Sequence, residues 1–190
     1  MFTLPDGTDG VTALALVSTI ADDGNGGVAD HLATDAEVHN WVANRFPGAL
    51  VVPDRVRTLR FAARSAFAAS VFPHPPSRVE RTRRMSDTEA AAVLHNAVNA
   101  LRAETVVTIE DGVRRRLQTA ARGPALVEGA LALAVVEFLT GPLAPRLRSC
   151  QAPRCVRYFV QQHGRQQWCK ASCGNRARVA RFASQQQDRG

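Results

Sequence analysis

The four cysteines of this 190-residue chain are confined to one short segment near its C-terminal end. They form two close pairs, C-x4-C and C-x3-C, with 13 residues between the pairs. Two local turns can each offer two thiolates to one ion, and Zn²⁺ prefers four such ligands in a tetrahedron. The spacing therefore predicts one closed, structural zinc site, with the ligands Cys150, Cys155, Cys169 and Cys173.

Two other uses of these thiols fit the sequence less well. Disulfides need an oxidising compartment, but the first residues, MFTLPDGTDG, lack the basic and apolar regions of a secretory signal. A redox centre favours a C-x-x-C pair, which the sequence does not contain. His163 could replace one ligand, but four thiolates already fill a closed site, so we interpret it as a turn residue. We expect a cytoplasmic protein.

Positive charge is concentrated around the cysteines. Residues 143–190 contain ten Lys or Arg and one acid, a net charge of +9, whereas residues 1–142 contain 14 basic and 16 acidic residues, a net charge of −2. Tyr158, Phe159 and Trp168 are interleaved with the basic residues, which indicates a folded surface rather than a basic tail. We place a domain boundary near Pro142, between a domain over 1–142 and a small metal-binding domain over 143–190.

The N-terminal domain is predicted to be helical. Thr34 followed by Glu37 forms a capping-box pattern for a helix over 35–46. Pro53 begins an amphipathic helix whose arginines fall on the polar face, and Ser86 begins a third helix. The segment 11–22 predicts a short helix or strand.

One hairpin and one apolar helix complete this domain. β-branched residues over 105–109 lead into an Asp111-Gly112 turn and then a basic strand, as in a β-hairpin. The apolar run over 125–139 contains two glutamates and is shorter than the roughly 20 residues that cross a bilayer. We interpret it as a buried core helix, with a dimer seam as the alternative, and expect no membrane contact. The fold class is mainly α with a short β-hairpin, that is α+β.

The metal-binding domain over 143–190 is called the finger below. Its residues between the cysteine pairs predict a second β-hairpin, with strands over 156–160 and 166–168 and a turn at 163–165. A helix then begins at Cys173. A knuckle, a hairpin and a helix that carries the last ligand, in this order, build a treble-clef-like finger. Gly174, which has no Cβ, would let the helix backbone approach the sulfurs closely.

The final helix has two predicted faces. At 100° per residue, one stripe is polar and is placed for phosphate or base-edge contact, and the other side is apolar and placed for packing. Asn175 and Arg176 point away from the polar stripe and are expected to support the zinc knuckle. The polar stripe contains Arg178, Arg181 and Gln185, and the packing side contains Val179, Phe182 and Ala183.

These residues resemble a known family. C-x4-C, an aromatic segment and then WC-x3-CGNR resemble the CGNR zinc-finger family of bacterial transcription regulators. In that family the finger follows an ABATE-type domain, a stress-induced regulator, and HLATDAEVHNWV over 31–42 resembles its Leu-Ala-Thr and Trp helix. The resemblance implies one structural Zn²⁺, DNA binding and a supporting role at the zinc site for Trp168, Gly174, Asn175 and Arg176.

We therefore expect a DNA-binding transcription regulator whose finger contacts nucleic acid through Arg178, Arg181 and Gln185. Its N-terminal domain would sense an effector, such as a small molecule, or form a homodimer. The alternative is a zinc-stabilised module that binds RNA or a protein, and exposed finger aromatics would favour RNA. The histidines of the N-terminal domain are scattered and form no catalytic motif, so we expect no enzyme.

Overall fold

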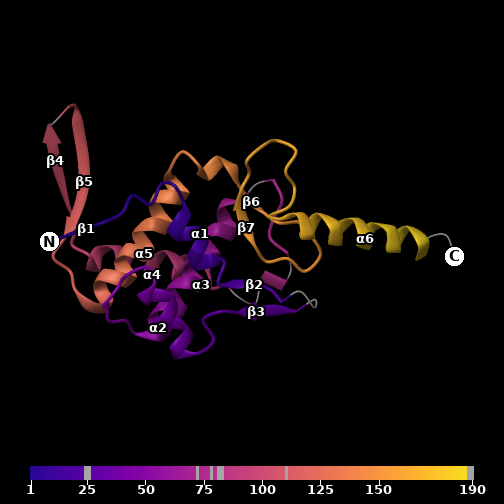
Figure 1. The fold of residues 1–190 in the computed structure, drawn as a ribbon, viewed down its shortest axis with the longest axis horizontal. Coiled ribbons are helices and arrows are strands. Elements are labelled where there is room, and N and C mark those ends of the chain that lie inside the picture. Colours follow the sequence, from indigo (N-terminus) through magenta and orange to yellow (C-terminus); the bar gives the residue numbers. More distant parts are fainter. Residues whose placement is uncertain (24–26, 72, 78, 81–83, 110, 188–190) are drawn as a thin grey trace.

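The computed structural model describes the whole chain except residues 24–26, 72, 78, 81–83, 110 and 188–190. It has an α+β fold, with helices packed around a central α5 and two elements that project from opposite ends (Figure 1). The helices are α1 (Val11–Val17), α2 (Asp35–Ala43), α3 (Pro53–Ser70), α4 (Asp87–Ala100), α5 (Gly123–Thr140), a 3-10 turn η2 (Ala144–Arg146) and α6 (Ala171–Gln187). The strands are β1 (Phe2–Thr3), β2 (Ile20–Asp22), β3 (Val28–Asp30), β4 (Glu104–Ile109), β5 (Val113–Thr119), β6 (Leu147–Ser149) and β7 (Tyr158–Val160).

Local sequence signals begin the helices where expected. The Thr34 side chain accepts a hydrogen bond from the Glu37 backbone N–H, and the Glu37 carboxylate accepts one from the Thr34 N–H, which completes the capping box of α2. Ser86 accepts from the Glu89 backbone N–H at the start of α4. Segment 11–22 forms both a helix and a strand, α1 and β2.

The apolar helix α5 is the centre of the core. It packs against α1, α3 and α4, and its buried residues include Leu131, Val135 and Phe138. Gly129 permits a close approach of α5 to α4, since a Cβ there would lie 2.8 Å from the carbonyl oxygen of Ala97 on α4. Within the described residues α5 alone has the length and hydropathy to cross a membrane, but here it packs inside the protein.

The predicted hairpin is formed by β4 and β5. The strands pair antiparallel from Glu104↔Gln118 to Ile109↔Val113, and β1 adds a short third strand at the base of β5. Asp111 and Gly112 have φ angles of 52° and 117°, the left-handed conformations that an Asp-Gly turn supplies.

The prediction of a hairpin inside the finger is wrong about the strand that pairs with β7. β7 pairs with β6, which precedes the first cysteine, and residues 166–168 form no strand. Side-chain amides compete with a ladder here, because Gln161 Nε2 donates to the Gln166 carbonyl at 3.0 Å and Gln166 Oε1 accepts from the Gln162 N–H at 2.7 Å. These bonds hold residues 161–166 as a loop.

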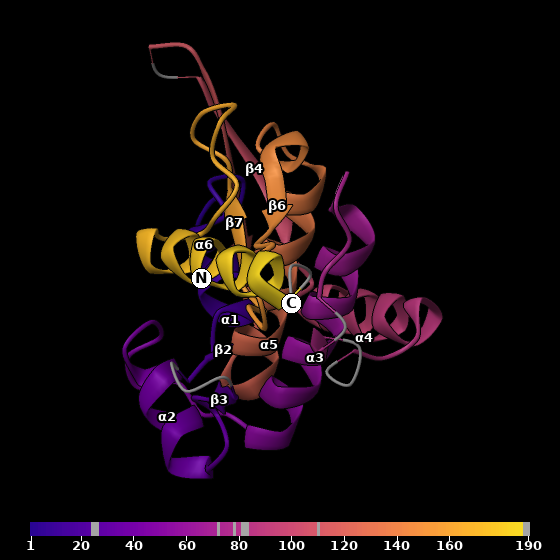
Figure 2. The same cartoon turned by 90° about the vertical axis from the view of Figure 1, so that its right-hand side faces the viewer.

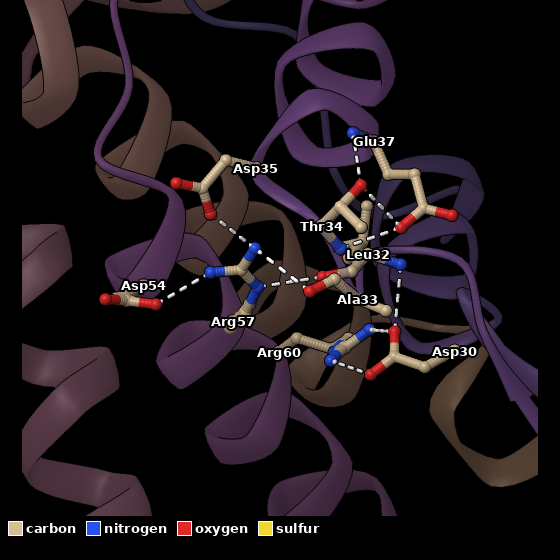
Figure 3. Close-up of polar contacts among 9 residues, drawn as sticks. All are labelled: Asp30, Leu32, Ala33, Thr34, Asp35, Glu37, Asp54, Arg57 and Arg60. Carbon is tan, nitrogen blue, oxygen red and sulfur yellow. Dashed lines mark hydrogen bonds and ion pairs between the residues drawn. The ribbon is translucent and has the colours of Figure 1, made fainter.

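The prediction that the arginines of α3 lie on a polar, solvent-exposed face is wrong for two of the four, whereas Arg55 is exposed as predicted. Arg60 and Arg64 are fully buried rather than on a solvent-exposed face. Arg60 pairs with Asp30 at the end of β3, with a 2.8 Å bond from its guanidinium to Oδ2, and Asp30 Oδ1 accepts from the Leu32 N–H at 2.8 Å (Figure 3). Burial alone would raise the pKa of Asp30, but the hydrogen bonds from Arg60 and Leu32 and the charges of Arg60 and Arg57 together outweigh it, so the pKa lies below its ordinary value.

Arg57 completes this attachment of α3 to the segment before α2. Its Nε donates to the Leu32 carbonyl at 2.8 Å, and its two terminal nitrogens donate to Asp35 and Asp54 at 2.7 Å each (Figure 3). The segment between β3 and α2 is thereby fixed to α3 by backbone as well as side-chain bonds.

Arg64 connects residues 1–142, called the helical region below, to the finger. Its Nε donates to Glu80 Oε1 at 2.7 Å, a terminal nitrogen donates to the Val156 carbonyl at 2.7 Å, and the Val17 carbonyl accepts from the other. Tyr158 on β7 donates to Glu80 Oε1 at 3.2 Å, and burial raises the pKa of this phenol, so it remains a donor. One buried ion pair thus joins α1, α3 and β7.

We predict that Glu80→Ala destabilises the protein strongly. It leaves the guanidinium of Arg64 buried without its carboxylate, which costs about 3–5 kcal/mol of the free energy of unfolding. Urea denaturation measures the change. Asp54→Ala is the control, because that carboxylate is 91% exposed and its loss should change stability little. Equal losses in the two variants would contradict the role of the buried pair.

Candidate metal centre

The four cysteine sulfurs form a cluster of the size that one zinc ion requires. All four Sγ atoms lie within 4.8 Å of one another, and three of the Sγ–Sγ distances are 3.6, 3.9 and 3.9 Å. A tetrahedron with Zn–S bonds of about 2.3 Å has edges of about 3.8 Å. The thiols are free, so no disulfide competes for these positions. The residues therefore fit a single structural Zn²⁺.

Two turns present the four sulfurs. Cys150 follows β6 and Cys155 lies in the turn before β7, where its N–H donates to the Ala152 carbonyl at 3.0 Å. Cys169 precedes α6, and Cys173 sits in its first turn, with its N–H on the Lys170 carbonyl at 3.1 Å. The predicted order of a knuckle and a ligand-bearing helix is present, with β6 in place of the predicted return strand.

The close packing of the four thiols also favours a bound cation. Hydrogen bonds from Cys155 and Cys169 hold the pKa of Cys150 well below its ordinary value. Hydrogen bonding to Cys150 raises the pKa of both Cys155 and Cys169. One thiolate thus forms easily, whereas each further thiolate must form beside an existing negative charge. A bound divalent cation removes this conflict because it stabilises all four thiolates together.

Donors around the cluster offset its negative charge. The Cys169 N–H donates to Cys150 Sγ at 3.4 Å, and a terminal nitrogen of Arg176 lies 3.5 Å from Cys173 Sγ. Four thiolates on Zn²⁺ carry a formal charge of −2, so a guanidinium beside them is favourable. Arg176 therefore lies beside the metal site.

Arg176 also joins the metal site to the helical region. It donates to Asp22 Oδ1 at 3.1 Å, and Lys170 Nζ lies 3.8 Å from Asp22 Oδ2. The Asp22 side chain is only 4% exposed. Burial would raise its pKa, but the hydrogen bond and charge of Arg176 together with the charges of Lys170 and Arg157 outweigh burial, and the pKa is lowered. Asp22 on β2 is therefore an anionic anchor for the start of α6.

Sequence reasoning missed Asp22, and only a weak signal could have found it. It ends a short apolar run, IAD, beside the DGNGG loop, where an acid is ordinarily a solvated turn residue. Its partners lie about 150 positions later in the chain, so no local pattern connects them.

The role of Gly174 differs from the one predicted. A Cβ at this position would lie 2.9 Å from Cδ1 of Trp168, so the glycine makes room for the indole rather than for the sulfurs. Trp168 is partly buried and packs against the cysteine cluster with Phe159. The contact that the structure gives Asn175 is with Arg178, whose guanidinium donates to the amide oxygen.

The outer part of α6 is exposed on all sides. Arg178, Arg181 and Gln185 face solvent, where nucleic acid could reach them. The predicted packing side does not pack, because Val179 is 69% and Phe182 is 62% exposed. After Ala177 every described residue of the helix is exposed, and the helix projects from the molecule (Figure 1).

Comparison with known families assigns both parts of the chain. Residues 146–186 match the CGNR zinc finger, and residues 10–142 match ABATE, described as "Putative stress-induced transcription regulator". The chain belongs to the ABATE family. A search of curated proteins gave no match. This ABATE protein therefore combines a transcription-regulator family with a zinc finger whose four ligands lie together, and neither family is an enzyme family.

We predict that Gly174→Ala weakens the finger. The added methyl group must displace the Trp168 indole, and overpacking of this kind costs about 1–3 kcal/mol. Gly174→Ala should release zinc at a lower chelator concentration than the unaltered protein. Gly164→Ala is the matched control, because no atom lies within 4 Å of the Cβ that it adds. Identical zinc retention in both variants would contradict the packing of Trp168 on Gly174.

Proposed function

We propose that this ABATE protein is a DNA-binding transcription regulator in which the exposed part of α6 contacts the DNA. The observation that carries the proposal is the projection of α6 beyond Ala177 (Figure 1). The helix contains three arginines and no acid. Among the described residues, no carboxylate pairs with Arg178 or Arg181, so their charges are available to phosphates.

The distribution of charge supports the same orientation. Residues 143–190 carry +9 and residues 1–142 carry −2. A duplex attracts the finger and repels the remainder weakly, so diffusional encounter would favour the finger end. Each phosphate that an arginine neutralises releases counterions, which makes the affinity depend steeply on salt.

The base of α6 explains how the helix is held for this contact. Cys173 is a metal ligand in its first turn, and Arg176 bridges that sulfur to Asp22 of the helical region. A rigid helix loses little conformational entropy when it binds. The remaining three exposed turns can then enter a major groove, which is wide enough for an α-helix.

For the helical region we propose a sensing or dimerising role without catalysis, in the cytoplasm. A cavity of about 550 Å³ lies where this region meets the finger, and His74, Arg148, Phe159 and Trp168 are among the residues that line it. This volume suits a small-molecule effector. An effector there would contact both the loop after α3 and the finger.

RNA binding is less well supported, and protein binding is the second candidate. Stacking on bases needs exposed aromatic rings, but Tyr158 and Phe159 are 4% and 8% exposed, which leaves Phe182 on α6 as the strongly exposed ring of the finger. Val179 and Phe182 on α6 are the observation that favours a protein partner, because isolated apolar side chains of this exposure suit an apolar groove.

We predict that Arg178→Ala/Arg181→Ala weakens DNA binding and flattens its salt dependence. Loss of two phosphate contacts should lower the slope of log affinity against log salt by about 1.8. Fluorescence anisotropy of the zinc-loaded protein measures this, with a duplex from upstream of its own gene and a scrambled duplex. Preference for the upstream duplex would identify a sequence-reading regulator.

The control for charge alone is Arg55→Ala, since Arg55 on α3 is 65% exposed and far from α6 in sequence. This variant should bind DNA like the unaltered protein. DNA binding that the double variant leaves unchanged would overturn the assignment of α6 and leave the protein partner as the function of that helix.

A further inference from the structure

The β4–β5 hairpin, called the arm below, extends beyond its structural support. β1 pairs with β5 only at Phe2↔Thr119 and Thr3↔Gln118, at the base of the arm. The rest of the arm projects from the molecule at the end opposite α6 (Figure 1). A two-stranded hairpin in water is only marginally stable unless something covers one of its faces.

One face of the arm is apolar and exposed. Ile109 lies directly opposite Val113, and Val107 lies opposite Arg115, so these four side chains share a face. Ile109 is 80%, Val113 76% and Val107 58% exposed. Monomeric proteins seldom leave adjacent β-branched residues this exposed, which points to a binding partner.

The charges of the arm argue against DNA as that partner. Residues 104–119 contain three arginines and three acids, so the arm has no net charge to attract phosphates. The arginines are consecutive in β5, and Arg115, which is 63% exposed, also lies 3.7 Å from Glu137 of α5, whereas Asp111 lies in the turn at the tip. Each arm thus has an acidic tip and a basic shaft.

We propose that the arm is a dimerisation element that binds the arm of a second copy of this chain, apolar face to apolar face. When two such arms cross in opposite directions about a twofold axis, Asp111 at each tip lies beside Arg115, the arginine that shares the apolar face of the other shaft. The same surface serves both copies, as an isologous interface requires. The pattern is self-complementary in charge. It needs no DNA and stands independently of the function proposed for α6.

The apolar area on each arm sets the expected affinity of the dimer. Three exposed aliphatic side chains per copy, with ion pairs at the ends, form an interface at the small end of the range for specific complexes. The dissociation constant should be on the order of micromolar.

Sedimentation velocity of the full-length, zinc-loaded protein over a concentration series tests the proposal. The unaltered protein should dimerise, and Ile109→Ser/Val113→Ser should raise the dissociation constant more than tenfold. Val179→Ser/Phe182→Ser is the matched control, since it removes two exposed apolar side chains from α6 instead, and it should dimerise normally. Far-UV circular dichroism and zinc content confirm that each variant is folded.

A second variant tests the charge pairing. Asp111→Asn removes the carboxylate but keeps a residue that tolerates the left-handed backbone at this position, where φ is 52°. It should weaken the dimer several-fold and make it less sensitive to salt. A monomer at all concentrations, or a dimer that the Ile109/Val113 variant leaves intact, would overturn the proposal. If the protein is monomeric and the Ile109/Val113 variant loses affinity for DNA, the arm contacts DNA instead, and the proposal is overturned.

Discussion

The finger depends on four sulfur atoms that only a shared cation can hold together. Its own apolar cluster is small, consisting of the cysteines with Ala152, Phe159 and Trp168. So little buried surface cannot offset the conformational entropy of the loops on either side, whereas zinc binding contributes folding free energy directly. Because Cys173 is part of α6, the position of the whole projecting helix follows from the metal site. The orientation of the exposed arginines Arg178 and Arg181 thus follows from the metal site at the base of the helix.

Buried ion pairs join this metal-dependent unit to the helices. Arg64 and Glu80 lie beneath β7, and Tyr158 and the Val156 carbonyl complete their hydrogen bonds. At the base of α6, Asp22 accepts a hydrogen bond from Arg176. Leu147 and Tyr158 belong to the main hydrophobic core, and β7 contacts α1 (Figure 2). A change in the helical region, such as effector binding, can therefore reach the base of α6 through packed groups rather than through a flexible linker. The boundary that we placed near Pro142 remains a prediction about folding units.

Local chemistry was predictable from the sequence, and long-range pairing was not. The capping box at Thr34, the Asp111-Gly112 turn and the cysteine spacing each involve residues within a few positions of one another, so a pattern carries the information. The partner of β7 depends on which strand can bury Tyr158 and Leu147 together, which the letters QQW do not reveal. In the sequence, Arg60 and Arg64 match the polar face of an amphipathic helix. Their burial depends on Asp30 and Glu80, which lie against them only in the folded structure.

The most direct test of the account is the affinity for duplex DNA of the zinc-loaded protein and of the same protein stripped by a chelator, at one salt concentration. The account predicts that removal of zinc releases α6 and abolishes salt-dependent binding, while circular dichroism shows the helices α1–α5 still folded. Equal affinity with and without zinc would contradict it, because the DNA-contacting surface would then not depend on the metal site.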